Sequence, residues 1–346
     1  MEWDKTEKKQ LLLYCIIAFG VTYVLGIFMW YGQKKGLDVS AFPNAQMMYP
    51  AAGVMFAYLL TAGRDKKMPR AFYVGYLILT VLMIVCAVLS IVMPDEIMMV
   101  GMTMVPLWTY VVQIAMMAGS ILYWILLLAS GKERRRAYGL FGSQWKTSIL
   151  MILLFVALYF FRTFLSYIGE GEARTFFKIM AQPDSWIYLA VMPVNFFLVM
   201  APFFGEEYGW RYYLQPLLQK RFGLRGGVLI LGIVWGLWHL PVDFFYYSPG
   251  SGLQAAVSQQ ITCITLGIFF AYAYMKTNNI WVPVILHYIN NNLIPVITGN
   301  YTASVLENQE ITWAALIPAL LVNGILFGGF LLSGVFSEKN REKRTD

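Results

Sequence analysis

Apolar runs of about 20 residues recur along this whole chain, and each is long enough to cross a bilayer as a helix. A helix satisfies its own backbone hydrogen bonds in lipid, so these runs favour an α-helical membrane protein over a soluble fold. Only 13% of the 346 residues are charged, against about 25% in soluble domains. We therefore predict an all-α fold, a polytopic transmembrane helical bundle.

The apolar runs predict about ten spans. They lie near residues 11–31, 46–63, 72–93, 106–130, 147–168, 186–205, 227–246, 255–275, 280–297 and 311–334. The stretch 97–130 is too long for one helix, so its first third is expected to be re-entrant or interfacial. The first run is too long for the apolar region of a signal peptide, so we expect it to be retained as a span.

Positive charges fall in alternate connections between these spans. Of the 26 Lys and Arg residues, 20 lie in one set of connections and termini, and 4 lie in the other. Because Lys and Arg are enriched in cytoplasmic loops, this alternation predicts a multi-pass protein of the cell membrane with both termini cytoplasmic. The net charge of +7 is explained by these loops and their contact with anionic lipid. Membrane lipid, and not nucleic acid, is therefore an expected partner.

Ionisable groups inside spans are costly and so mark functional sites, and here they concentrate in the C-terminal half. The segment 205–211 reads Gly-Glu-Glu-Tyr-Gly-Trp-Arg. On a helix Glu207 and Arg211 are four residues apart and can form an ion pair. Glu206 lies about 100° around the helix, without such a partner. The alternative is that both glutamates only mark the end of the sixth span.

The two histidines of the chain lie in two later spans. His239 is near mid-membrane beside Pro241, which removes a backbone hydrogen bond, and Asp243 one turn further on could hold a ring nitrogen. His287 and Asn291 share a helix face, and two convergent donors can stabilise an oxyanion. The alternatives are histidine packing and asparagine hydrogen bonds between helices. From helix depth we expect all three clusters in the cytoplasmic half of one cavity.

Three short motifs occur in order on separate predicted helices. They are Glu-Glu-x-x-x-Arg at 206–211, aromatic-x-x-x-His at 235–239 and His-x-x-x-Asn at 287–291. The ordered triple resembles the CPBP family, which comprises the type II CAAX prenyl endopeptidases and the bacteriocin-processing and immunity proteins. The resemblance covers about residues 186–300. Trp235 stands where phenylalanine is more usual, and we expect this difference to affect pocket shape rather than chemistry.

The resemblance implies an intramembrane endopeptidase that uses no metal and no other cofactor. It implies that Glu206 is the general base that activates water and that His239 shares this water. It also implies that His287 and Asn291 stabilise the oxyanion.

The resemblance further implies that Glu207 and Arg211 support the site. The substrate would be a membrane-associated peptide or protein, a lipidated one with a prenylated CAAX-type terminus, or a leader peptide. The expected organisation is an N-terminal transmembrane region of unassigned role (1–185), a catalytic core (186–300), and a last helix with a basic cytoplasmic tail (301–346).

Two other functions remain open. A zinc-dependent intramembrane protease could use His239, His287 and Glu206 as ligands, which is a legitimate catalytic set, although no His-Glu-x-x-His motif is present. A non-catalytic protein, such as a bacteriocin-immunity or peptide-binding protein or a small transporter, could instead bind a ligand in the cavity. A transporter built from repeats is disfavoured because the polar residues lie in one half of the chain.

Overall fold

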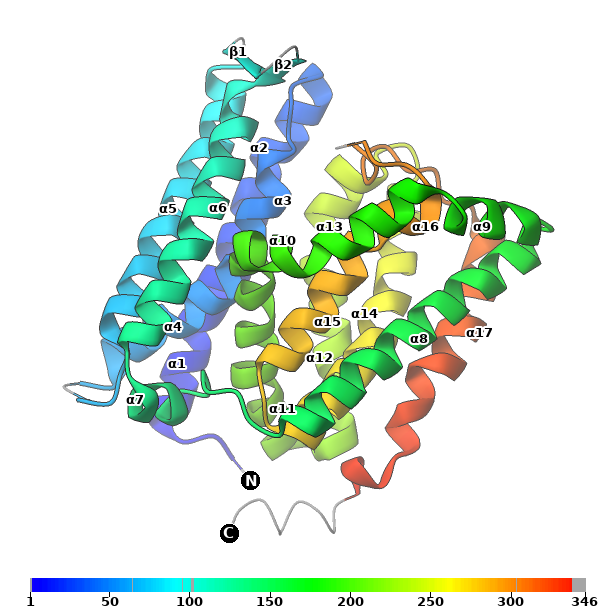
Figure 1. The fold of residues 1–346 in the computed structure, drawn as a ribbon. Helices are drawn as coiled ribbons and strands as arrows, with labels where there is room; N and C mark the ends of the chain where they lie inside the picture. Colours follow the sequence, from blue (N-terminus) through cyan, green and yellow to red (C-terminus); the bar gives the residue numbers. More distant parts are fainter. Residues whose placement is uncertain (1, 64, 95, 101–102, 303, 338–346) are drawn as a thin grey trace.

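The computed structural model describes residues 2–63, 65–94, 96–100, 103–302 and 304–337. The chain begins with a long helix made of α1 (Lys5–Cys15), the π-helical η1 (Ile16–Val21) and α2 (Thr22–Lys35). The next elements are α3 (Ala41–Gln46), α4 (Tyr49–Thr61), α5 (Arg70–Val92), β1 (Ile97–Val100), β2 (Thr103–Pro106), α6 (Leu107–Ala129) and α7 (Lys132–Ala137). These elements form one side of the molecule in Figure 1.

The second part of the chain supplies the rest of the bundle. Its first elements are α8 (Trp145–Gly169), α9 (Ala173–Met180), α10 (Pro183–Glu207), the π-helical η2 (Tyr208–Leu214), α11 (Gln215–Phe222), α12 (Leu224–Trp238), α13 (Leu240–Val242) and the π-helical η3 (Asp243–Tyr247). Its last elements are α14 (Gly252–Thr277), α15 (Trp281–Asn292), α16 (Ile294–Thr298), α17 (Trp313–Leu326), and the 3₁₀ turns η4 (Gly328–Leu332) and η5 (Gly334–Phe336).

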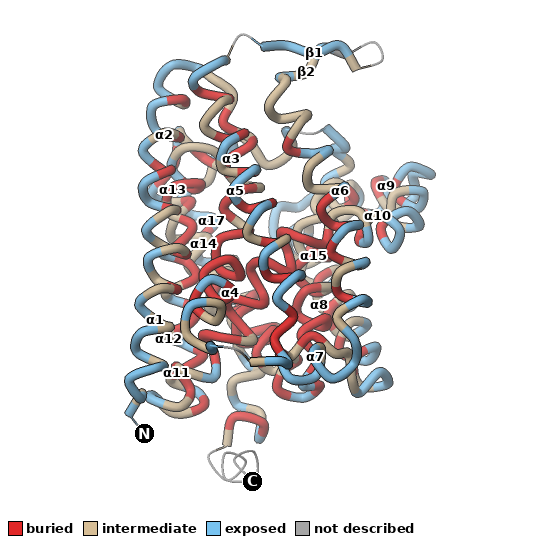
Figure 2. Tube along the Cα trace, turned by 90° about the vertical axis from the view of Figure 1, so that its left-hand side faces the viewer, coloured by how far each residue is buried: buried red, intermediate tan, exposed pale blue. Residues whose placement is uncertain are grey.

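The described residues confirm the predicted all-α polytopic bundle. Seven helices are long and apolar enough to cross a membrane, or eight if α12 and the bent α13–η3 segment count as one span. Buried residues fill the centre and exposed residues cover the outside of the tube in Figure 2. Many exposed side chains are large and apolar, such as Ile78 and Ile325, which is the surface that lipid requires.

Two of the ten predicted spans are shorter than expected. The run 46–63 forms α4, with 13 residues, and the run 280–297 is divided between α15, with 12 residues, and α16. At 1.5 Å per residue these helices reach only about 20 Å, less than the roughly 30 Å of a bilayer core. Both are apolar because they are mostly buried in protein, which hydropathy alone does not distinguish from lipid exposure.

The start of the long stretch 97–130 is a β-hairpin and not a helix. Ile97 pairs with Pro106 and Val100 with Thr103 in an antiparallel register. The hairpin projects at the end of α5 and α6 in Figure 1, so this piece does not re-enter the bundle.

The two ends of the bundle differ in charge. The end where α1 begins also holds α7, the last turn of α11 and the start of α15 (Figure 1). We call it the basic end, because it holds Lys66 and Lys67 in a connection, and Lys220 and Lys276 in the last turns of α11 and α14. The opposite end holds the hairpin and the segment 299–312. The predicted basic tail from Lys339 onward lies outside the described residues.

Candidate active site

The glutamate pair lies below a sharp kink in α10. Val199 has non-helical angles (φ −128°, ψ 20°) inside this helix. Pro202 explains the kink, because a proline cannot donate the backbone hydrogen bond to the carbonyl four residues earlier and its ring crowds that turn. After the kink the chain runs toward the basic end (Figure 1) and carries Glu206 and Glu207 in its last turn.

Two glycines let this helix pack tightly against the N-terminal part of the chain. A Cβ atom on Gly205 would overlap the carbonyl oxygen of Met47, and one on Gly209 would overlap Pro50. Gly205 and Gly209 are four residues apart and so lie on the same face, which is the small-x-x-x-small pattern of close membrane helix contacts. The break between α3 and α4 therefore supports the glutamate pair directly.

The carboxylate of Glu207 is buried and contacts both the guanidinium group of Arg211 and the imidazole ring of His287. Arg211 Nε donates to Glu207 Oε2 at 3.0 Å, and His287 Nδ1 lies 2.8 Å from Glu207 Oε1. Arg211 also donates to the Gly267 carbonyl at 3.2 Å and stacks over Trp235, with 5.2 Å between the guanidinium carbon and the ring centroid. The structure thus contains the ion pair predicted from helical spacing and adds His287 to it.

Glu206 has entirely different partners. The indole Nε1 groups of Trp235 and Trp210 both donate to Glu206 Oε2, at 2.8 Å and 3.3 Å. Hydrogen bonds of this kind fix the carboxylate and stabilise its ionised form. Among the described residues no hydrogen bond reaches Oε1, so this oxygen is the one left for a ligand or water.

The His239 ring is oriented by a backbone carbonyl and not by Asp243. Its Nδ1 lies 2.9 Å from the Trp235 carbonyl, which is free because the His239 backbone N–H bonds to Gly236 instead. A carbonyl only accepts, so Nδ1 carries the proton and Nε2 is the free acceptor. Asp243 is buried, and its Oδ2 has no hydrogen-bond partner among the described residues.

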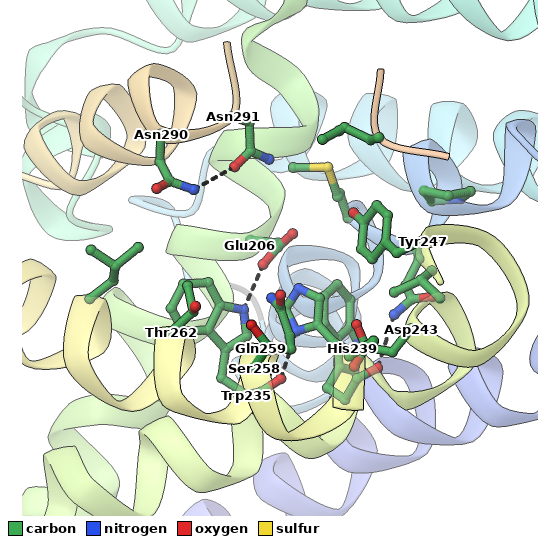
Figure 3. A pocket seen from close by; sticks show the side chains of 18 of the residues that line it. Glu206, Trp235, His239, Asp243, Tyr247, Ser258, Gln259, Thr262, Asn290 and Asn291 are labelled. Carbon is green, nitrogen blue, oxygen red and sulfur yellow. Dashed lines mark hydrogen bonds between the residues drawn. The ribbon is translucent and has the colours of Figure 1, made fainter. Parts of the chain in front are cut away.

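Asn291 is held from one side by its neighbour on α15. Asn290 Nδ2 donates to Asn291 Oδ1 at 2.9 Å, and the Asn290 carbonyl accepts from Tyr159 on α8 at 3.1 Å. The bond fixes the amide so that the Asn291 NH₂ group is available to donate elsewhere. Figure 3 shows both asparagines on one side of Glu206, with Trp235 and His239 on the other.

These side chains meet at a cavity of about 200 Å³. Glu206, His239, His287 and Asn291, the four predicted working residues, all line it, whereas Glu207 and Arg211 lie behind its wall. Polar residues complete one side, namely Asp243, Ser258, Gln259 and Thr262 (Figure 3).

The cavity extends further than helix depth indicated. Besides the predicted site residues, its lining includes Ser248, Leu306, Gln309 and Ile311, from connections at the end opposite the basic end. The expectation that the three clusters lie in the cytoplasmic half of the cavity stays a prediction, and helix depth did not indicate an extension toward the opposite end.

Sequence reasoning also missed the tryptophan donors. Trp235 was expected to change only pocket shape, but it supplies the shorter hydrogen bond to Glu206. Trp210 is four residues from Glu206, so helical spacing could have indicated its contact. The contact between Glu207 and His287 joins residues 80 positions apart, and no local pattern signals it.

Comparison with known proteins agrees with the motif pattern. Residues 186–293 match the family described as type II CAAX prenyl endopeptidase Rce1-like. The CAAX prenyl protease 2 of Methanococcus maripaludis is 30% identical over 106 residues, which are 29% of this chain and 39% of the archaeal protein. This chain thus matches well under half of the length of that relative. No solved structure matches the chain. The resemblance read from the motifs is confirmed, and the segment that carries them is similar to the type II CAAX prenyl endopeptidases.

Proposed function

We propose that this protein is an intramembrane endopeptidase that hydrolyses a peptide bond with water activated by Glu206 and His239. One observation carries the proposal. A carboxylate held through one oxygen by Trp235 and Trp210 shares a cavity with two imidazoles whose Nδ1 atoms are already engaged. Both histidines therefore have only Nε2 left for a ligand.

In this mechanism Glu206 and the neutral His239 ring bind one water molecule. Glu206 takes a proton as the water oxygen attacks the peptide carbonyl carbon, which gives a tetrahedral intermediate. The C–N bond then breaks, and the same proton passes to the leaving amine. The second proton of the water stays on the attacking oxygen, so the immediate products are a carboxylic acid and an amine, which ionise to a carboxylate and an ammonium group in water. Glu206 returns to its ionised form.

The oxyanion of the intermediate would be stabilised by His287 Nε2 and the Asn291 amide. His287 has to be protonated to donate from Nε2, because its Nδ1 proton faces Glu207. Glu206 and Glu207 as anions with Arg211 and His287 as cations give a neutral set, which is the arrangement that a buried site favours. Preorganised donors of this kind contribute about 3–4 kcal/mol each in hydrolases.

The proposed substrate is a membrane-associated peptide or protein. A prenylated CAAX-type terminus and a leader peptide are both compatible with the family match, and the archaeal relative is named for the first. The proposed location is the cell membrane. Residues 186–300 would form the catalytic core, and residues 1–185 would support it through α3 and α4.

The central test replaces Glu206 by glutamine. Glu206→Gln keeps the size of the side chain and its hydrogen bonds but removes the base, so we expect at least a hundredfold loss of cleavage. Quantitative proteomics of membranes that contain wild-type or variant protein would identify products that disappear. Glu133→Gln, at an exposed position on α7, is the matched control and should leave the product pattern unchanged.

The same experiment separates the alternative functions. A cellular phenotype that survives Glu206→Gln intact would favour a non-catalytic immunity or peptide-binding protein. Among the described residues no group of three His, Cys, Asp or Glu side chains is arranged to hold a metal. Loss of cleavage on treatment with a strong chelator, with recovery on addition of zinc, would favour the zinc protease.

A further inference from the structure

The cavity is closed on the side of the basic end by large buried side chains. Trp210, Trp238 and Arg211 are among the largest fully buried residues of the described chain. Trp238 Nε1 donates to the Ala18 carbonyl at 2.8 Å, and Arg211 is fixed by Glu207. A peptide approaching from the basic end would have to displace this packed layer.

On the other side the cavity reaches the connections of the opposite end. Leu306, Gln309 and Ile311 belong to the segment 299–312, and they line the cavity. Residues 304–312 are held to the connection after η3 by hydrogen bonds. Among them, Gln309 N donates to the Tyr247 carbonyl at 2.6 Å, and Ile311 N donates to Ser251 Oγ at 2.9 Å. Gln309 itself is exposed, so the mouth of the cavity lies beside a surface segment.

The charge distribution assigns a side of the membrane to that mouth. The connections and helix ends of the opposite end carry acidic residues, namely Asp38, Glu170, Glu172, Asp184, Glu307 and Glu310. Their basic residues are few, and nearly all others lie at the basic end or in the basic tail. Positively charged connections stay in the cytoplasm, so the basic end faces the cytoplasm and the mouth faces away from it.

We propose that the cavity opens to the non-cytoplasmic side of the membrane and receives its peptide from there, beside the segment 299–312. That the ligand is a peptide rests on the proposed function, whereas the direction in which the cavity opens does not. The substrate class is then a polypeptide with a scissile bond presented at the outer face, such as an exported peptide or the outer segment of a membrane protein. An opening on this side narrows the proposed substrates: a peptide presented at the outer face is favoured over a terminus anchored only on the cytoplasmic face, such as a prenylated CAAX-type terminus, which would not reach Glu206.

Cysteine labelling of the full chain tests the direction. Cys15, Cys86 and Cys263 are replaced by serine, and single cysteines are introduced as Gln309→Cys at the mouth, Ser258→Cys in the cavity wall and Lys132→Cys on α7. A membrane-impermeant maleimide is added to intact cells and to inside-out vesicles. Size-exclusion chromatography in detergent checks that each variant is folded.

We expect Gln309→Cys and Ser258→Cys to react in intact cells at least tenfold faster than in inside-out vesicles, and Lys132→Cys to show the reverse. Reaction of Ser258→Cys only in inside-out vesicles, or failure of both cavity cysteines to react from outside, would overturn the proposal. Labelling does not depend on activity. If labelling gives the expected pattern but no cleavage product disappears in Glu206→Gln, the direction of opening is supported and the peptidase function is rejected.

Discussion

Glu206 and Glu207 are adjacent in the chain but are held by different chemistry. Glu207 faces Arg211 and His287 behind the cavity wall, whereas Glu206 accepts from Trp235 and Trp210 at the cavity. Different surroundings are the means by which a protein gives neighbouring carboxylates separate roles. A charged supporting acid and a working acid can therefore occupy consecutive positions of one helix turn.

The two indole donors give a prediction at this scale. Trp235→Phe removes a 2.8 Å hydrogen bond to the Glu206 carboxylate, and a bond to a charged group contributes about 1.5–3 kcal/mol. We expect kcat to fall roughly tenfold or more with a smaller change in KM, because the base is less well positioned. Steady-state kinetics on a cleaved peptide would measure both constants.

Trp210→Phe is the matched comparison, because its bond to the same oxygen is longer, at 3.3 Å. It should reduce kcat less than Trp235→Phe does. Equal losses in the two variants, or a loss confined to KM, would contradict a positioning role for Trp235.

Local spacing predicted some of these residue contacts and not others. The Glu207–Arg211 pair and the shared face of His287 and Asn291 follow from helical periodicity within one turn. The orientation of His239 by the Trp235 carbonyl did not follow, because it depends on a backbone bond that is lost as α12 ends. Contacts between different helices depend on packing, which a single sequence does not specify.

At the scale of elements, the contact between η2 and α4 holds the site against the N-terminal helices. Gly209→Ala would place a methyl group into Pro50, and overpacking of this kind costs about 1–3 kcal/mol. We expect a lower thermal unfolding midpoint in detergent, with loss of activity at temperatures where the wild type is still active. Differential scanning fluorimetry would measure the midpoint.

Gly324→Ala on α17 is the control, because nothing lies within 4 Å of the added atom. Alanine favours a helix over glycine by about 1 kcal/mol, so this midpoint should be unchanged or slightly raised. A Gly209→Ala midpoint equal to that of Gly324→Ala would show that the close approach to Pro50 is unimportant.

Element prediction succeeded where a run was both apolar and long. Helices α5, α6, α8 and α14 lie close to their predicted ranges. The lengths of the helices at α4 and α15 were overestimated, because a short helix buried in protein and a full span exposed to lipid have similar hydropathy. The hairpin of β1 and β2 was missed, since Met-rich apolar segments do not distinguish strand from helix.

For the whole molecule, the first and last described segments lie at the same end of the bundle (Figure 1). This is the basic end, so the charge rule predicts that both termini are cytoplasmic. Green fluorescent protein fused to either terminus should fluoresce, and alkaline phosphatase fused there should be inactive, in bacterial cells.

Fusions after residue 181, in the connection between α9 and α10, are the control and should give the opposite result, because this connection lies at the opposite end. Active phosphatase at either terminus would show that this terminus is not cytoplasmic and would contradict the predicted topology. The division of the chain at 185 and 300 remains a prediction, although the N-terminal helices contact the core closely. Trp3 donates to the Leu217 carbonyl at 3.0 Å, and Glu7 pairs with Lys220 at 2.7 Å.

The ion pair between Glu207 and Arg211 also bears on how the chain enters the bilayer. A single charged residue at the centre of a span costs about 2.5–3.5 kcal/mol during insertion by the translocon. Because the two partners are one helical turn apart, they neutralise each other as soon as that turn forms, before any later helix is made. His287 is synthesised 80 residues later. These charges are therefore tolerated during biogenesis, and the contact with His287 is completed only when α15 is in place.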